Sequence, residues 1–590
     1  MRLALALAAL ALLAGPARAQ DADSYELRQV QRALAAQGYA PDPAPAGKTI
    51  EAIHIVRYEV FVEDEPFPVF LNAFHWLTVE NVVRREILPK PGDAFDAERL
   101  LESARNLRAL RIFSVVAALP VQAKTPGKVD LLVVTRDLWS LRLEWNLQFT
   151  DAQIDQLLVQ LTERNLFGRN KLVLGRLLVL PLTWSVGEAY IDRRLVGEPL
   201  HLEQSADVFF RREDDAFDGF TTRLEVARPF YDLDQAYGFR LQAQIQDRVF
   251  RHYRAGEVLT WDDPETDAEE AVRRVFDTEQ IRFSALGRRQ LSGPFTQRLA
   301  LGLGASRLSV QANDETALPA ANAESFARHV LPRPLTQIYP VVAWAGFARD
   351  FRTYEDLSSF GVSEDVQLGP DLSLTLSAPL EALGSTVNAV ELFAAAAWAA
   401  AFGGDGLTEI ALGAEARLED GRWIDQDVLL RARVASPRLG IGRLVTRADW
   451  LIRREDTSNS PVTLGGNNGL RGYPSEFFFT FGGSRLRANG EYRTPPLVWH
   501  YLHVGAVAFY DAGDVYGDGD AFALRQSVGV GLRGLLPQFN REVFRLDLGV
   551  PIDGSGFSVT LSGGTGQAVP LTNREDLQFD STVGNLYNQP

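Results

Sequence analysis

Apolar and polar residues alternate along most of this chain, from residue 140 to residue 569. In residues 237–246, every odd position is apolar and every even position is glycine, arginine or glutamine. Residues 299–304 and 557–562 follow the same pattern. Because successive side chains of a strand point to opposite faces of the sheet, this pattern predicts strands with one apolar and one polar face. We therefore expect a mainly β protein built from a long series of amphipathic strands.

A transmembrane antiparallel β-barrel accounts best for these strands, because within a bilayer only helices and closed barrels satisfy every backbone polar group. The longest uncharged apolar run, residues 392–402, has the length of one barrel strand and is too short for a spanning helix. A soluble sandwich or propeller is the alternative for the region, and a buried helix for this run. We assign residues 138–569 to the barrel, with about fifteen candidate strands before residue 471 and five after it.

A small α/β domain precedes the barrel at residues 49–137. The pattern predicts a strand within residues 53–62, a helix that Thr78 caps and Pro89 ends, and a second helix capped by Asp96. Two further strands are expected at residues 112–120 and 129–134. The predicted order is therefore strand, helix, helix, strand, strand.

The residues ahead of this domain predict export. Arg2 precedes an apolar stretch, and Ala17-Arg18-Ala19 forms an A-x-A cleavage motif, so we expect residues 1–19 to be a signal peptide. An uncleaved membrane anchor is the alternative. Residues 20–48 then contain a short helix, at residues 25–37, and a proline-rich run that predicts a stiff, extended linker.

Composition excludes several classes of function. The chain has no cysteine, so it has no disulfide and no thiolate metal site. Its formal net charge of −16 argues against nucleic acid as a partner, because such proteins usually need a basic face. The sequence has no G-x-S-x-G nucleophile motif, and the acidic residues 262–267 lack the spacing of a Ca²⁺ loop. We expect no enzymatic activity, no catalytic residue, no cofactor and no metal.

Three motifs follow one another in the last third of the chain. A glycine-rich stretch leads into Leu470-Arg471-Gly472-Tyr473, an E-Y-R strand contains Glu491, and Phe509-Tyr510-Asp511-Ala512-Gly513 has the form F-x-D-x-G. Period-two geometry places Phe509, Asp511 and Gly513 on one face, and Glu491 on the polar face of its own strand. An arginine that leaves water needs carboxylate partners, so Asp511 and Glu491 are the candidates for Arg471. An exposed loop arginine is the alternative.

With these motifs, and with N-L-F-G-R-N at residues 165–170, the sequence resembles the outer-membrane assembly and translocation barrels that include BamA, TamA and the two-partner-secretion transporters, also described as bacterial surface antigens. The resemblance covers nearly the whole mature chain. It implies one POTRA domain at residues 49–137, a barrel of sixteen strands where the alternation gives about twenty, and a lumenal loop whose Arg471 pairs with Glu491 and Asp511.

The last predicted strand, residues 557–569, contains Gly563, Gly564 and Gly566, and glycine inside a strand weakens its pairing. This strand must close against the first barrel strand, predicted at residues 140–149, so we expect a weak seam. The resemblance implies that the seam opens laterally; the alternative is that the glycines relieve crowding or form a bulge. Where the family usually ends in an aromatic residue, this chain has Val569 and continues through a polar tail, residues 570–590.

The resemblance implies a protein of the Gram-negative outer membrane that inserts or translocates polypeptides, with its POTRA domain in the periplasm. Its expected partners are outer-membrane lipid, client polypeptides held by the POTRA domain, and periplasmic accessory proteins. Two alternatives stay open. One is a dedicated two-partner-type secretion pore plugged by the helix at residues 25–37, although those transporters carry two POTRA domains. The other is a passive channel or structural barrel.

Overall fold

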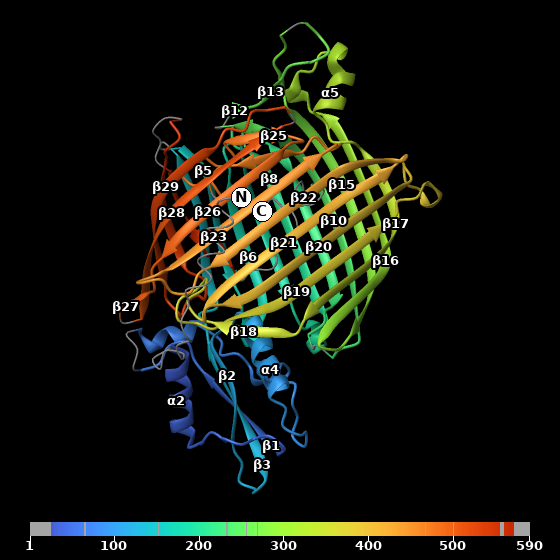
Figure 1. The fold of residues 1–590 in the computed structure, drawn as a ribbon. Coiled ribbons are helices and arrows are strands. Elements are labelled where there is room, and N and C mark those ends of the chain that lie inside the picture. Colours follow the sequence, from blue (N-terminus) through green and yellow to red (C-terminus); the bar gives the residue numbers. More distant parts are fainter. Residues whose placement is uncertain are drawn as a thin grey trace.

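In the computed structural model, a large barrel stands on a small α/β unit (Figure 1). The predicted signal peptide and the tail beyond residue 571 lie outside the described residues. We call the barrel mouth beside the α/β unit the proximal mouth, and the opposite one the distal mouth. The structure describes residues 25–63, 67–150, 153–231, 234–254, 257–267, 269–466, 468–499, 501–517, 519–554 and 560–571.

The barrel is one closed antiparallel sheet in which neighbours along the chain are neighbours in the wall. The last strand pairs with the first and closes the sheet. The strand segments of the wall are β4 (Leu141–Thr150), β5 (Gln153–Glu163), β6 (Lys171–Val179), β7 (Thr183–Asp192), β8 (His201–Arg211), β9 (Phe217–Arg228), β10 (Tyr237–Arg251), β15 (Val275–Leu291), β16 (Phe295–Ala312), β17 (Leu335–Ala348), β18 (Asp350–Tyr354), β19 (Glu364–Ser377), β20 (Ala389–Phe402), β21 (Gly406–Glu419), β22 (Arg422–Ala435), β23 (Arg443–Arg454), β26 (Ser484–Arg493), β27 (Leu497–Trp499), β28 (Leu502–Tyr516), β29 (Arg525–Leu535), β30 (Phe544–Pro551) and β31 (Thr560–Thr565).

Two of these segments continue others, because β17 and β18 both pair with β19, and β26 and β27 both pair with β28. The wall therefore has twenty strands, fifteen before Arg471 and five after it. This confirms the count from the alternating pattern. The sixteen strands implied by the family resemblance are wrong for this chain. The motifs that carry the resemblance lie mostly in the last five strands, so they do not determine how many strands precede them.

The outer face of the barrel is apolar. On β10, Leu241 and Ile245 are 43% and 42% exposed, whereas Gln244 and Gln246 are 9% and 2% exposed. The alternation predicted for these residues is thus present, with the apolar side chains outward. A continuous band of exposed apolar residues around a closed sheet is suited to the acyl region of a membrane.

The α/β unit contains a three-stranded sheet in the order β1-β3-β2, with β1 parallel and β2 antiparallel to β3. The predicted order of strands and helices is present. In the described part of the chain, none of the helices is long and apolar enough to cross a membrane. The elements of the unit are α2 (Tyr25–Gln37), β1 (Thr49–Tyr58), η1 (Val69–Phe74), α3 (Glu80–Arg84), α4 (Ala97–Ala109), β2 (Phe113–Gln122) and β3 (Lys128–Asp137).

Local details of the α/β unit differ from the predictions at three places. Helix α3 ends at Arg84, before the predicted end at Pro89. Strand β1 ends at Tyr58, so residues 60–62 lie beyond it. Thr78 does not cap α3; its hydroxyl donates instead to Asp137 over 2.8 Å, because β3 brings this carboxylate beside it. Asp96 caps α4 as predicted, and its carboxylate accepts from the amides of Glu98 and Arg99.

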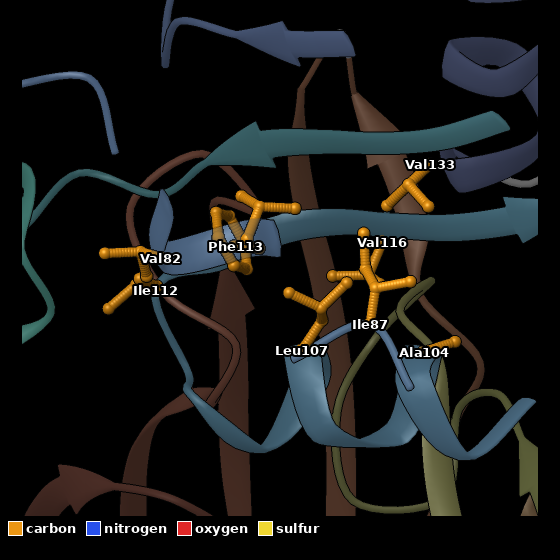
Figure 2. Packing of buried hydrophobic residues seen from close by; sticks show 9 residues of the cluster. Val82, Ile87, Ala104, Leu107, Ile112, Phe113, Val116 and Val133 are labelled. Carbon is orange, nitrogen blue, oxygen red and sulfur yellow. The ribbon is translucent and has the colours of Figure 1, made fainter. Parts of the chain in front are cut away.

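A hydrophobic core fills the space between the sheet and helices α3 and α4 (Figure 2). Val83 of α3, Leu107 of α4, Phe113 of β2 and Val133 of β3 are each at most 1% exposed. Burying such a side chain contributes about 1.5–3 kcal/mol. The α/β unit thus has a core of its own, separate from the barrel.

Helix α2 covers the other face of the sheet, below the barrel in Figure 1. Ala33 is fully buried there against Leu132 and Val134. The proline-rich segment folds back along β2, where the amide of Asp42 donates to the carbonyl of Pro120 over 3.1 Å. The predicted extended linker is therefore part of the α/β unit, and α2 lies outside the lumen, in contrast to the plug expected of a secretion pore.

The turn between β5 and β6 fixes the α/β unit to the barrel. The amide of Val79 donates to the carbonyl of Gly168 over 2.9 Å, and the side chain of Asn165 donates to the Thr78 hydroxyl. Gly168 has a φ of +68°, and a Cβ atom there would lie 2.5 Å from the carbonyl oxygen of Leu77. The turn motif at residues 165–170 is thus the docking point of the α/β unit.

Smaller elements lie outside the barrel wall. At the distal mouth, one group of them packs around Trp261 and Phe326, and β24 pairs with β25 as a hairpin. These elements are η2 (Leu166–Gly168), η3 (Leu195–Gly197), β11 (Tyr253–Arg254), β12 (Glu257–Val258), β13 (Thr260–Trp261), β14 (Val272–Arg273), η4 (Asp314–Thr316), η5 (Ala320–Asn322), α5 (Ala323–His329), η6 (Glu381–Leu383), β24 (Pro461–Leu464) and β25 (Phe478–Phe481).

Candidate functional site

The loop between β24 and β25 folds from the distal mouth into the lumen. Leu470 is fully buried, and Arg471 and Tyr473 are each 3% exposed. Leu470 and Tyr473 pack on Leu464, the last residue of β24. Arg471 therefore lies in the interior, and the alternative of an exposed loop arginine is wrong.

The Arg471 guanidinium contacts both carboxylates that the sequence singled out. Its Nε and Nη2 atoms each donate over 2.8 Å, to different oxygens of Asp511, and Nη1 donates to Glu491 over 2.6 Å. The backbone amide of Arg471 also donates to Asp511, over 3.1 Å. Asp511 and Glu491 are both fully buried. Such a two-point contact fixes the orientation of the guanidinium and also pairs its charge with a carboxylate.

Phe509 and Gly513, the other members of the F-x-D-x-G motif, have packing roles beside this pair. The guanidinium carbon of Arg471 lies 3.7 Å from the centroid of the Phe509 ring, a cation–π contact. A Cβ atom at Gly513 would lie 2.5 Å from the carbonyl oxygen of Leu486 and 2.9 Å from the side chain of Leu464. Only glycine therefore allows the loop to approach the wall at this point.

The ion network contains further residues: Asp547 and Arg533, which lie outside the motifs, and Arg493, the arginine of the E-Y-R motif. Asp547 on β30 lies 3.4 Å from Nη1 of Arg471 and 2.6 Å from Nη1 of Arg533. Arg493 lies 2.6 Å from the second oxygen of Glu491. Asp547 belongs to no motif, but it lies on the polar face of an alternating strand, and that period was the signal available in the sequence.

Gly472 and Tyr473 hold the rest of the loop against the wall on both sides of the seam. Gly472 has a φ of +99°, and a Cβ atom there would lie 3.0 Å from the side chain of Ser527 on β29. The Tyr473 hydroxyl donates to the carbonyl of Gln526, and the Tyr473 carbonyl accepts from the side chain of Gln148 on β4, each over 3.2 Å. The loop therefore spans the junction of the first and last strands from the inside.

In the described residues, strand β31 pairs with β4 from Thr560 to Gly563 and closes the wall. A Cβ atom at Gly563 would lie 2.5 Å from the indole ring of Trp145, so this glycine makes room for a ring on the first strand. Gly564 lies beside the same residue. Gly566 has a φ of +83°, and the chain leaves the wall there.

The last strand ends earlier than predicted. It ends at Thr565, and Val569 is 1% exposed inside the lumen, not at the end of a wall strand. The first two residues of the predicted polar tail, Pro570 and Leu571, also lie in the interior. A local sequence pattern could not show this, because the residues that hold the segment are far away along the chain.

No group of three or more residues that could hold a metal ion occurs in the described part of the chain. The fold and the site together define the class of the protein. It is a closed twenty-strand barrel with an apolar outer face, whose lumenal loop is held by an arginine on buried carboxylates of the wall.

Comparison with known proteins shows similarity at the level of fold. No family model and no curated protein matches the sequence. Among solved structures, BamA from Haemophilus ducreyi lacking POTRA domains 1-3 is 11% identical, with 87% of this chain and 84% of that chain covered and a TM-score of 0.34. CdiB from Acinetobacter baumannii is 9% identical, with 89% and 74% covered and a TM-score of 0.43. CdiB from Escherichia coli is 11% identical, with 88% and 77% covered and a TM-score of 0.38. Identities and TM-scores this low carry no information on activity.

Proposed function

We propose that this protein is a barrel of the Gram-negative outer membrane that inserts or translocates polypeptides. One arrangement carries the proposal: Tyr473 of the lumenal loop contacts β4 on one side of the seam and β29 on the other, and Arg471 fixes this loop to Asp511. Gly563 makes room at the closure for the ring of Trp145, and a closure that a lumenal loop bridges from the inside is suited to a wall that opens beside a client. The seam residues are Gly563, Gly564 and Gly566.

The α/β unit, as a POTRA domain on the periplasmic side, would hold the clients. Strand β1 is at one edge of its sheet, and beyond Ile50 the described residues place no other strand on that edge. An extended polypeptide can add to such an edge through main-chain hydrogen bonds, which require little sequence specificity. Turn residues 165–170 would keep this edge at a fixed distance from the proximal mouth. Periplasmic accessory proteins would bind other faces of the same unit.

The two alternative functions receive less support. A secretion pore with a removable plug requires a helix in the lumen, but α2 packs on the sheet of the α/β unit. A passive channel has no need of a lumenal loop fixed to the wall, but Tyr473 of this loop contacts the wall on β4 and β29. The proposal involves no catalytic step, cofactor or metal.

Depletion of the protein in its own host tests the proposal. If it inserts or translocates polypeptides, a defined set of outer-membrane or secreted proteins decreases while their periplasmic forms accumulate. Restoring the wild-type chain should restore these proteins, and restoring a chain with the seam closed by a disulfide should not. Unchanged outer-membrane and secreted proteomes after depletion would contradict the proposal.

A further inference from the structure

A second segment crosses the lumen, from the proximal mouth. After Gly566 the chain leaves the wall, and Val569 and Leu571 become 1% and 5% exposed. The barrel is already closed at this point, because the pairing of β31 with β4 ends at Gly563. Residues 566–571, which we call the C-terminal strap, are therefore not needed to complete the wall.

The apolar side chains of the strap lie in a pocket made by strands distant from the seam. Val569 and Leu571 pack with a cluster of buried residues from β18, β19, β21, β22 and β23 and from the loop that joins β18 to β19. In the order of the wall, β23 and β22 are five and six strands from β31. The strap thus reaches across the lumen to the wall of the pocket. The cluster consists of Tyr354, Leu357, Val366, Leu407, Ala435, Val445, Val569 and Leu571.

Three arginines of the wall hold the polar groups of the strap. Arg533 donates to the side chain of Gln567 over 2.9 Å, Arg493 to the carbonyl of Val569 over 2.6 Å, and Arg433 to the carbonyl of Pro570 over 3.2 Å. Two of these three contacts are to backbone carbonyls, which every polypeptide has. The apolar contacts come from residues two apart. The pocket and the arginines that hold the strap, which we call its seat, therefore fit an extended chain with apolar side chains at alternate positions.

Two of these arginines belong to the ion network of Arg471: Arg493 also pairs with Glu491 over 2.6 Å, and Arg533 with Asp547 over 2.6 Å. The third, Arg433, lies 3.8 Å from Glu409. If the strap leaves its seat, each of the three arginines therefore keeps a carboxylate within ion-pair distance. A buried charge without a partner would cost several kcal/mol and would hold the strap in place permanently. The strap can therefore leave at moderate cost.

We propose that the seat of the strap is a binding site for extended polypeptide segments, and that the strap occupies it as a tethered competitor. The partner is a segment with apolar residues at two alternate positions, bound through its carbonyls to Arg493 and Arg433. This inference rests on the proposed function, because it identifies polypeptide as the ligand of the lumen. It adds a site that is separate from the sheet edge of the α/β unit.

Cysteine labelling of the purified full-length protein tests the site, since the wild-type chain has no cysteine. In the V569C variant, the thiol reacts with a soluble maleimide only while the strap is out of its seat. The V507C variant is the matched control, because Val507 is 3% exposed but belongs to the wall strand β28. Heat-dependent mobility on gels verifies that both variants form the barrel.

Three hexapeptides are added. Gly-Gln-Ala-Val-Pro-Leu is the strap itself, Ser-Ser-Ser-Ile-Ser-Leu keeps only apolar residues at its fourth and sixth positions, and Gly-Gln-Ala-Asp-Pro-Asp replaces those two residues with aspartate. A tethered segment competes at an effective concentration on the order of millimolar, so the peptides are used at several millimolar. We expect slow labelling of V569C without peptide and an increase of about tenfold with either apolar peptide, because labelling follows the open fraction. The aspartate peptide should change nothing, and V507C should stay protected throughout.

Fast labelling of V569C without peptide would overturn the proposal, because the seat would then be empty at rest. Equal labelling rates with and without the apolar peptides would also overturn it, because the strap would be a fixed part of the barrel. An equal effect of the aspartate peptide would indicate general loosening and would overturn it as well. Failure of the proposed function appears separately, as unchanged proteomes after depletion, and does not alter the labelling rates of the purified protein.

Discussion

Arg471 and Asp511 form a two-point ion pair inside the barrel, with two guanidinium nitrogens each 2.8 Å from a different carboxylate oxygen. Forty residues separate them along the chain. The pair therefore joins the lumenal loop to β28, and Glu491 extends it to β26. Loop position and wall geometry are coupled through one side chain.

Replacing Arg471 with alanine should loosen the loop and destabilise the folded barrel. The change leaves Asp511 and Glu491 buried without their shared cation, and removal of one partner of a buried ion pair costs about 3–5 kcal/mol. The R471K variant keeps the charge but not the planar two-point contact, so it should lose less stability than R471A. Urea unfolding in detergent micelles measures the stability, and the proteome readout measures the function.

The R328A variant serves as the control for an arginine in an exposed ion pair. Arg328 lies 2.8 Å from Glu265 at the distal mouth, with side chains 55% and 44% exposed. Such pairs contribute at most about 1 kcal/mol, so R328A should resemble the wild type. If R471A assembles and functions normally, Arg471, Glu491 and Asp511 have no part in the mechanism.

A disulfide across the seam should block function if the seam opens. Leu561 and Phe149 face each other in the register of β31 and β4, so L561C/F149C places two thiols on directly opposite residues of a background without cysteine. We expect loss of client insertion or translocation under oxidising conditions and recovery on reduction. The control A394C/A414C joins β20 and β21, far from the seam, and should leave function unchanged. Full function of the oxidised seam variant would contradict lateral opening.

The G168A variant should weaken the docking of the α/β unit. Alanine at a φ of +68° costs about 1–2 kcal/mol, and its Cβ would also displace the carbonyl of Leu77. The amide of Val79, which donates to the Gly168 carbonyl, should then exchange its hydrogen faster. Gly175 has a negative φ and open space around its Cβ position, so G175A is the matched control. Equal exchange at Val79 in both variants would show that the turn does not hold the unit.

The sequence predicted the elements whose signal is local and periodic. Alternation predicted twenty strands and placed Asp511 and Glu491 on the polar faces that bring them to Arg471. The same rule applied to β30 would have found Asp547. The sixteen strands implied by the resemblance were wrong, because the matching motifs lie mostly around the last strands.

Segments that enter the lumen could not be predicted in the same way. The strap is held by contacts such as that of Arg433 with the Pro570 carbonyl, 137 residues apart in sequence, and no local pattern encodes such a pair. Thr78 illustrates the same limit at short range. It has the residue type of a helix cap, but β3 supplies a buried carboxylate, Asp137, and the hydroxyl binds that instead.

The position of α2 leads to a prediction that separates the proposed function from a plugged pore. Ala33 is fully buried against the sheet of the α/β unit, whereas Ala36 is exposed on the same helix. In A33R, the arginine would place a charge in that apolar contact, which costs several kcal/mol and should release α2; A36R should not. Protease sensitivity of the helix reports its release. Because α2 lies outside the lumen, single-channel conductance in planar bilayers should be the same for A33R, A36R and the wild type. A rise in conductance confined to A33R would mean that α2 obstructs the pore, and would favour the plugged secretion pore.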